Sequence, residues 1–208
     1  MSYLKRIFLI TMFMLLSFVS CLNLKQPANK ILYYALEYNP PEFSGMPRLS
    51  HTIKIDRFTV SPLYDNMGIV YKENEYQRDA YAYHKWRVNP GDIVTDLLTR
   101  DMRDSGLFKA VLPGGGIGTG TFYILGGNVD KFYEEDVNKD WNGILSLTIN
   151  LVNEKEKDPE KKIMFQKTYV RKKKCEKKNP QALAKALSQG MNEISREIIE
   201  DIYTRLKP

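Results

Sequence analysis

Residues 81–111 read YAYHKWRVNPGDIVTDLLTRDMRDSGLFKAV, and they predict a strand, a helix and a second strand in succession. Aromatic and alternating residues up to Trp86 are typical of a strand. Asn89 can cap a helix, and Pro90 suits its first position because a missing N–H costs nothing there. An apolar stripe at helical spacing follows and ends at Gly106; it comprises Ile93, Val94, Leu97, Leu98 and Met102.

Strand patterns continue on both sides of this unit. Aromatic and β-branched residues, bounded by Pro, Gly or Asn, indicate strands at residues 31–38, 51–60, 67–72, 75–88, 107–112, 121–135, 141–155 and 163–173. Within 51–60 the alternation changes phase, which predicts a bulge. Beyond Asn179 and Pro180, apolar residues recur every three or four positions up to Leu206, which predicts a long amphipathic helix.

These elements predict one α+β domain over residues 31–208, with an antiparallel sheet and two helices packed on one face. The apolar fraction of 43% is enough for a real core, and no internal repeat or second domain is visible. Without residues 1–20 the chain has 29 basic against 25 acidic side chains, an excess of four. So small an excess argues against nucleic acid as a partner.

The N-terminus has the pattern of a secretory signal peptide over residues 1–20. Lys5 and Arg6 precede an apolar run from Ile7 to Val19. As a helix, this run would reach only about 20 Å, whereas the apolar core of a bilayer is about 30 Å thick. A membrane-spanning helix is therefore the weaker interpretation.

Cys21 follows this run directly. The stretch Phe18-Val19-Ser20-Cys21 resembles a bacterial lipobox. In a lipobox, the peptide bond before the cysteine is cut, and the cysteine carries acyl chains such as palmitate. Ser20 fits the small residue expected before the cut, and Phe18 stands where Leu is usual. The alternative is an ordinary signal peptide that contains a cysteine. We predict lipid attachment at Cys21 and a tether over residues 21–30, which leaves Cys175 as a shielded thiol or an intermolecular bridge.

Residues that could carry catalysis are scarce. His51 and His84 are the only histidines, and their spacing fits no metal site, so neither a metal nor a cofactor is predicted. The glycine-rich stretch PGGGIGTGT (113–121) lacks the spacing and the following helix of a phosphate-binding loop, and it is interpreted as a hairpin turn. We predict no catalytic residue.

Two surface features allow two interpretations each. The basic run from Arg171 to Lys174 would attract anionic lipid, or else it is a solvated strand end, which we favour. On the strand at 75–88, His84 and Trp86 should share one face, with Tyr81 and Tyr83 on the other. The aromatic residues Tyr81, Tyr83 and Trp86 form a candidate partner surface, or they shield the backbone.

The order of these motifs resembles the ABC-type transport auxiliary lipoprotein family. The resemblance rests on three stretches in this order. The first is the strand YYALEY after Cys21, and the last is TFYILGGNVDKF (121–132). Between them, residues 81–111 contain a tyrosine-bearing strand, Trp86, Pro90, a helix with spaced leucines, and the pattern Gly-x-Phe-x-x-Val. It covers nearly the whole chain after the signal peptide.

The resemblance implies a non-catalytic lipoprotein that faces the periplasm and assists an ABC transporter. The implied partners are ABC subunits and a mammalian-cell-entry-type substrate-binding protein, which together move lipids between the inner and outer membranes. Association of the chain with further copies of itself, as a homo-oligomer, is also possible under this resemblance. Leu22 after Cys21 is similar to sequences sorted to the outer membrane. The alternatives are an outer-membrane assembly lipoprotein that supports a β-barrel partner, and a periplasmic lipid hydrolase.

Overall fold

The computed structural model describes Tyr3, Lys5, Ile7 and residues 29–115, 123–137 and 140–207. The chain divides into two units, Met1–Lys30 and Ile31–Pro208. In the first unit, Tyr3, Lys5 and Ile7 are helical and exposed.

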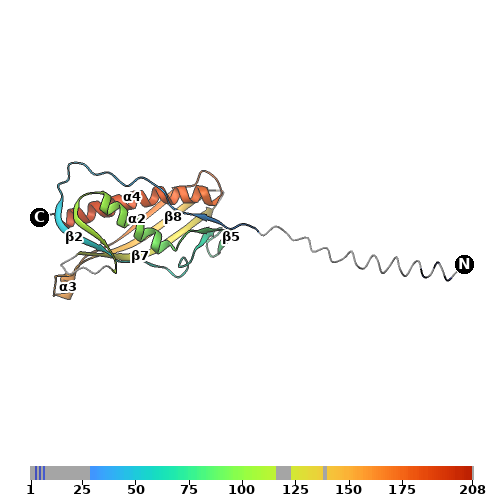
Figure 1. The fold of residues 1–208 in the computed structure, drawn as a ribbon, viewed down its shortest axis with the longest axis horizontal. Coiled ribbons are helices and arrows are strands. Elements are labelled where there is room, and N and C mark those ends of the chain that lie inside the picture. Colours follow the sequence, from blue (N-terminus) through green and yellow to red (C-terminus); the bar gives the residue numbers. More distant parts are fainter. Residues whose placement is uncertain are drawn as a thin grey trace. The chain divides into compact units, whose positions relative to one another are not determined.

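The folded unit contains one large sheet and two long helices (Figure 1). The strands are β1 (Leu32–Tyr34), β2 (Leu49–Ile55), β3 (Thr59–Val60), β4 (Gly68–Lys72), β5 (Arg78–Trp86), β6 (Phe108–Pro113), β7 (Tyr123–Val137), β8 (Asp140–Asn153) and β9 (Ile163–Lys174). The helices are α2 (Pro90–Asp104), the short α3 (Pro159–Lys162) and α4 (Pro180–Leu206).

The long strand β7 is the centre of the sheet. One of its edges pairs along almost its whole length with β8, which pairs in turn with β9. The other edge pairs successively with β2, β3 and β4. Beyond them, β6 extends the sheet from β2, while β5 and then β1 extend it from β4.

The predicted α+β class is confirmed, but the sheet is mixed. The prediction of antiparallel pairing is correct for β4 with β5 and for β7, β8 and β9. It is wrong for β1 with β5, β2 with β6 and the pairs of β7 with β2, β3 and β4, which are parallel. Residue alternation reports which face a side chain takes but not the direction of the neighbouring strand, so the pattern does not contain this information.

Both helices begin as their sequences predict. The Asn89 side chain accepts a hydrogen bond from the Gly91 N–H at the start of α2, and the Asn179 side chain accepts one from Ala182 at the start of α4. Beyond the end of α2, Gly106 has a φ of 67°, a conformation that favours glycine.

The core lies between the sheet and the helices α2 and α4, which contact each other and lie on one face of the sheet (Figure 1). Gly143 of β8 favours close packing of α4, because a Cβ there would lie only 3.2 Å from the Leu187 side chain. The buried residues of α4 and β8 form most of this layer: Leu183, Leu187, Met191, Ile194, Ile198 and Ile202 with Leu145, Leu147, Ile149 and Leu151.

The opposite face of β7, β8 and β9 carries a polar network. The Thr148 hydroxyl donates to Asp130 at 2.7 Å and lies 2.8 Å from the Thr168 hydroxyl. Further along, the Gln166 amide donates to Asn150 at 2.6 Å. These three strands therefore bury an apolar face against the helices and leave a polar face toward solvent.

Several predicted boundaries differ from the observed ones. The strand expected at 31–38 contains only Leu32–Tyr34, and the one expected at 51–60 is divided into β2 and β3 where its alternation changes phase. The glycine-rich stretch does not form a β-hairpin, because β2 lies between β6 and β7 and pairs with both. Residues 116–121 of this stretch lie outside the described part of the chain.

Candidate functional site

The predicted anchor lies mostly outside the described residues. This holds for Arg6, Ser20, Cys21 and Leu22, whereas Lys5 is described as an exposed helical residue. Within the part of the chain that the structure describes, no helix is long and apolar enough to cross a bilayer. Lipid attachment at Cys21 and the sorting role of its neighbours remain predictions.

The three residues of the candidate partner surface have three different environments. Trp86 is completely buried, and its ring lies edge-on against Phe132, with centroids 5.1 Å apart. It therefore cannot belong to an exposed surface, and this part of the prediction is wrong. Tyr81 is half-buried, and Tyr83 is 48% exposed.

An irregularity in β5 explains the misplaced faces. The pairing of β5 with β4 changes register between Gly68–Lys85 and Val70–Ala80. The rings of Tyr81 and His84 are in edge contact, with centroids 5.8 Å apart, so residues three apart share a side of the strand. A bulge of this kind interrupts strict alternation, and the sequence gives no local sign of it.

Tyr81 belongs to a buried cluster around Glu134. The Tyr81 hydroxyl lies 3.1 and 3.2 Å from the two carboxylate oxygens of Glu134, which is only 1% exposed. The Tyr71 and His84 rings pack on Tyr81, and the Tyr34 hydroxyl lies 2.8 Å from His84 Nδ1. Side chains of the four strands β1, β4, β5 and β7 thus form one connected cluster.

Burial sets the ionisation of this cluster. Loss of water raises the pKa of Glu134 above 4.5, with a smaller contribution from Asp136, although the Tyr81 hydrogen bond opposes the shift. Burial, followed by the proximity of Glu134, raises the pKa of Tyr81. The cluster therefore favours neutral side chains, and it holds strand β5 to the centre of the sheet.

Replacing Glu134 with glutamine should change how stability depends on pH. Between the ordinary glutamate pKa and the raised pKa of Glu134, the folded chain binds a proton that the unfolded chain has released. The free energy of unfolding of the unmodified protein therefore falls as pH rises through this window. We expect Glu134→Gln to remove that fall, so that the variant gains stability relative to the parent with rising pH in urea unfolding.

The neighbouring Glu135 provides a control of opposite sign. Its pKa is lowered chiefly by a hydrogen bond from Lys172, so its ionised form stabilises the folded state above the ordinary glutamate pKa. Glu135→Gln should lose this stabilisation at neutral pH and match the parent at low pH. Equal pH profiles for the two variants would contradict the assignment of Glu134 as a buried, proton-retaining group.

The basic run at the end of β9 is largely paired with carboxylates. Arg171 contacts Glu193 and Glu197 of α4 at 3.1 and 2.6 Å, and Lys173 contacts Glu193 as well. On the other face, Lys172 lies 2.5 Å from Glu135. The favoured interpretation, a strand end without a lipid-binding role, agrees with this pairing, which connects β9 to α4.

The described part of the chain contains neither a reactive thiol nor a cluster of metal ligands. Cys175 is buried, and burial raises the pKa of its thiol to about 11, so little reactive thiolate forms at neutral pH. Within the described ranges, no group of three or more His, Cys, Asp or Glu residues could hold a metal ion.

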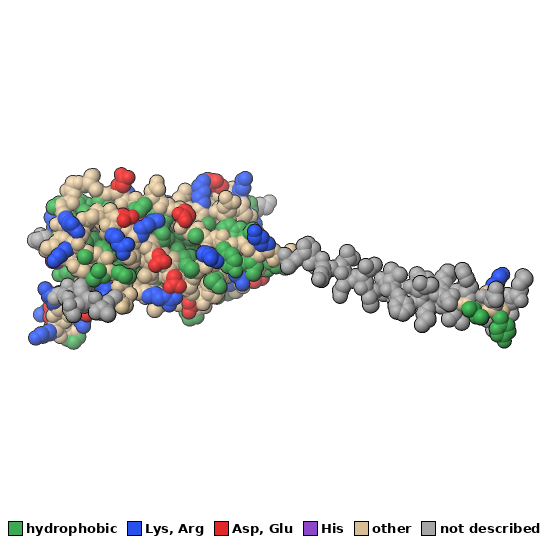
Figure 2. Space-filling view, in the orientation of Figure 1, with side chains coloured by type: hydrophobic (Ala, Val, Ile, Leu, Met, Phe, Trp, Pro, Cys, Tyr) green, Lys and Arg blue, Asp and Glu red, His purple; other side chains and the backbone are tan. Residues whose placement is uncertain are grey.

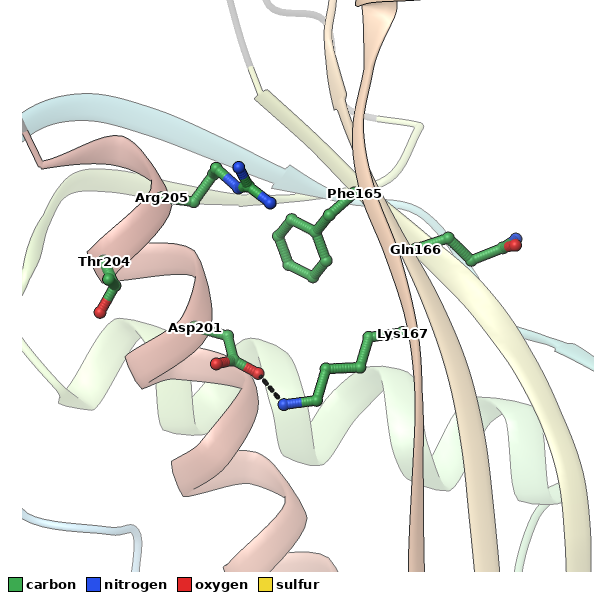
Figure 3. Close-up of a pocket in the computed structure, with 6 residues that line it drawn as sticks. All are labelled: Phe165, Gln166, Lys167, Asp201, Thr204 and Arg205. Atoms are coloured by element: carbon green, nitrogen blue, oxygen red, sulfur yellow. Dashed lines mark hydrogen bonds and ion pairs between the residues drawn. The ribbon is translucent and has the colours of Figure 1, made fainter.

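A cleft of about 530 Å³ lies between β9 and the C-terminal end of α4 (Figure 3). Lys167 and Asp201 form an ion pair of 2.6 Å at one side, and the Arg205 guanidinium lies over the Phe165 ring at 5.7 Å. The Gln166 side chain points away from the helix in Figure 3, toward its partner Asn150. The lining offers an ion pair and a cation on an aromatic ring, but no histidine, cysteine or serine for catalysis.

Comparison with protein families gives a match over residues 34–199, which is most of the folded unit. The matching family is described as the ABC-type transport auxiliary lipoprotein component. The chain belongs to this family. The resemblance inferred from the residues is therefore confirmed, and the chain is an auxiliary lipoprotein component of ABC-type transport. No curated protein matches the chain.

Two solved structures share the fold of this auxiliary lipoprotein. A Xanthomonas campestris protein of family DUF330 has 16% identity and a TM-score of 0.73, with 84% of this chain and 96% of that chain covered. An uncharacterized protein has 15% identity and a TM-score of 0.64, with coverages of 83% and 99%. At these identities the likeness concerns the fold alone.

Sequence reasoning on this auxiliary lipoprotein did not anticipate the Glu134 cluster or the exposed residues of β1. Glu134 lies within β7, where a strand is predicted at residues 121–135, but the strand pattern does not predict that its carboxyl group is buried. Glu134 lies opposite Gly143 of β8. The alternation of β8 assigns Gly143 to the face that the helices cover, and this assignment indicates that Glu134 is buried on the same face. The exposure of Leu32 and Tyr33 has no such local signal.

Proposed function

We propose that this chain is a non-catalytic lipoprotein of the outer membrane that faces the periplasm and assists an intermembrane lipid transporter. The transporter would combine ABC subunits with a mammalian-cell-entry-type substrate-binding protein. One observation carries the proposal, namely the family match across residues 34–199. The match includes both helices except the end of α4 and every strand from β2 to β9, so it concerns the folded unit as a whole.

The N-terminal sequence supports the anchoring part of the proposal. A charged start, a short apolar run and the lipobox-like residues before Cys21 are the signals of a lipidated leader. Leu22 is compatible with outer-membrane sorting. A tether of ten residues from Cys21 to Lys30 would hold the folded unit within about 35 Å of the membrane.

The use of ionisable side chains supports an accessory role without catalysis. The completely buried Asp101 accepts hydrogen bonds from the Tyr38 hydroxyl at 2.6 Å and from the adjacent Arg100 guanidinium. Glu134 is held by Tyr81, and Glu193, Glu197 and Asp201 of α4 are paired with β9. These contacts connect segments of the fold, whereas an active site needs groups directed at a substrate.

Chemical crosslinking in native membranes tests the proposal. The protein is captured with its crosslinked neighbours, which are then identified by mass spectrometry, and an uncrosslinked sample is the control. Recovery of ABC subunits or a mammalian-cell-entry-type protein is the expected result. Recovery of a β-barrel protein alone would replace the proposal with an assembly role, and recovery of neither would overturn both.

A further inference from the structure

Exposed apolar side chains gather where the folded unit begins. Six of them are between 39% and 49% exposed, and we call them the tether-end patch: Ile31, Leu32, Tyr33, Met67, Tyr83 and Val88. Figure 2 shows hydrophobic and basic side chains beside one another at the end of the unit where Figure 1 places β5. So many partly exposed aliphatic and aromatic residues in one region mark an interaction surface.

Strand pairing brings the patch residues together around one edge of the sheet, with the adjacent residues Leu32 and Tyr33 on opposite faces of β1. The edge strand β1 pairs with β5 so that Leu32 is opposite His84 and Tyr33 is opposite Lys85. On the other side of β5, the Trp86 N–H donates to the Met67 carbonyl at 2.8 Å. The patch residues of β1, of β5 and of the segment around Met67 therefore lie close to one another at the edge of the sheet.

Cations border the patch. The Arg87 guanidinium lies over the Tyr33 ring, 5.4 Å from its centroid. The backbone N–H of Arg87 donates to the Tyr34 carbonyl at 2.8 Å. Lys85 is opposite Tyr33 in the strand pair, and Lys30 directly precedes Ile31 in the chain. Tyrosines and aliphatic residues with Lys and Arg at the border are the composition of surfaces that lie at a lipid–water interface.

The position of the patch in the chain favours a membrane as its occupant. Nine residues separate Cys21 from Ile31, so an anchored Cys21 would keep the patch within about 35 Å of the bilayer. A tether this short gives a weak surface a high effective concentration of its target. This step rests on the proposed function, because it requires lipid attachment at Cys21.

We propose that the tether-end patch inserts into the headgroup region of the membrane that holds the anchor, and so fixes the orientation of the folded unit. Tyr33, Tyr83 and the neighbouring aliphatic side chains enter the boundary between headgroups and acyl chains, while Lys85 and Arg87 contact lipid phosphates. The backbone of edge strand β1 stays in the hydrated headgroup layer, where its free N–H and C=O groups can bind water.

Fluorescence quenching by lipid tests this orientation in the full, lipidated chain. The protein is placed in phosphatidylethanolamine–phosphatidylglycerol vesicles whose acyl chains are brominated near the headgroups. In a Cys175→Ala background, one sample carries a fluorophore at Val88→Cys in the patch. The other carries it at Glu160→Cys in α3, which Figure 1 places at the other end of the folded unit.

Severalfold stronger quenching at residue 88 than at residue 160 is the expected result. The double substitution Leu32→Ser and Tyr33→Ser should lower quenching at residue 88 toward the control value. Tyr76→Ser, at an 89% exposed residue outside the patch, should leave it unchanged.

Three other outcomes would overturn the inference, and they are distinguishable. Equal quenching at the two positions in a vesicle-bound protein rejects patch insertion alone and leaves the anchor intact. Protein that does not associate with vesicles rejects the anchor at Cys21 and the insertion with it. Protection of residue 88 only after transporter subunits are added would assign the patch to a protein partner and reject the lipid.

Discussion

Replacing Cys21 with alanine is expected to move the protein from the membrane pellet almost entirely into the soluble fraction. Each buried methylene of an acyl chain contributes about 0.8 kcal/mol to membrane binding, and stable anchoring needs more than one chain. Residues 7–19 are apolar, and a leader that is not cleaved can hold the chain to the membrane. In this variant, residues 1–20 are therefore replaced by the cleavable leader of a secreted protein that carries no lipid. Fractionation and the mass of the N-terminal peptide are the measurements.

The second cysteine provides the matched control for this experiment. Cys175 is 2% exposed at the end of β9, so Cys175→Ala behind the native leader should remain in the pellet with its acyl chains. A Cys21→Ala chain that stays in the pellet would show that a surface of the folded unit binds the membrane strongly by itself. In that case the lipobox-like sequence would have no anchoring role.

Local signals account for the part of the fold that the sequence predicted well. Asn89 and Pro90, like Asn179 and Pro180, specify helix starts through hydrogen bonds and a backbone angle that involve only a few consecutive residues. The alternation of β8 is equally local, and it places the four buried residues Leu145, Leu147, Ile149 and Leu151 on one face. Such features require no knowledge of distant segments.

The features that the sequence did not predict are non-local. The direction of β2 and β3 depends on their fit against one edge of β7, more than sixty residues further along the chain. The bulge in β5 depends on simultaneous pairing with β4 and β1. Periodicity within a strand cannot encode either constraint, because it records faces and not neighbours.

The same limit applies to the candidate surface. Composition singled out the aromatic residues of β5 but could not separate their environments, since strict alternation assigned Tyr81 and Trp86 to opposite faces. The structure instead places Tyr81 on buried Glu134 and Trp86 against Phe132, and leaves Tyr83 exposed. The surface proposed for interaction therefore moves from the middle of β5 to its border with β1.

Trp86→Ala should destabilise the folded unit by about 3–5 kcal/mol, the usual cost of deleting a large buried aromatic side chain. Trp86 is the last residue of β5 and has no exposed surface, and its ring packs on Phe132 of β7. The cavity would therefore open inside the core. Domains of this size are typically stable by about 5–15 kcal/mol, so the loss is a large fraction of the total. Urea unfolding followed by circular dichroism measures it.

Tyr83→Ala, three residues earlier on the same strand, is the control. Its side chain is 48% exposed and makes no contact comparable to that of Trp86 with Phe132, so its effect should remain near 0.5 kcal/mol. Trp86→Phe should fall between the two variants, because it keeps an aromatic ring beside Phe132 and leaves a smaller cavity. If Trp86→Ala were as stable as Tyr83→Ala but lost a binding partner, Trp86 would be a surface residue and the arrangement of β5 described above would be wrong.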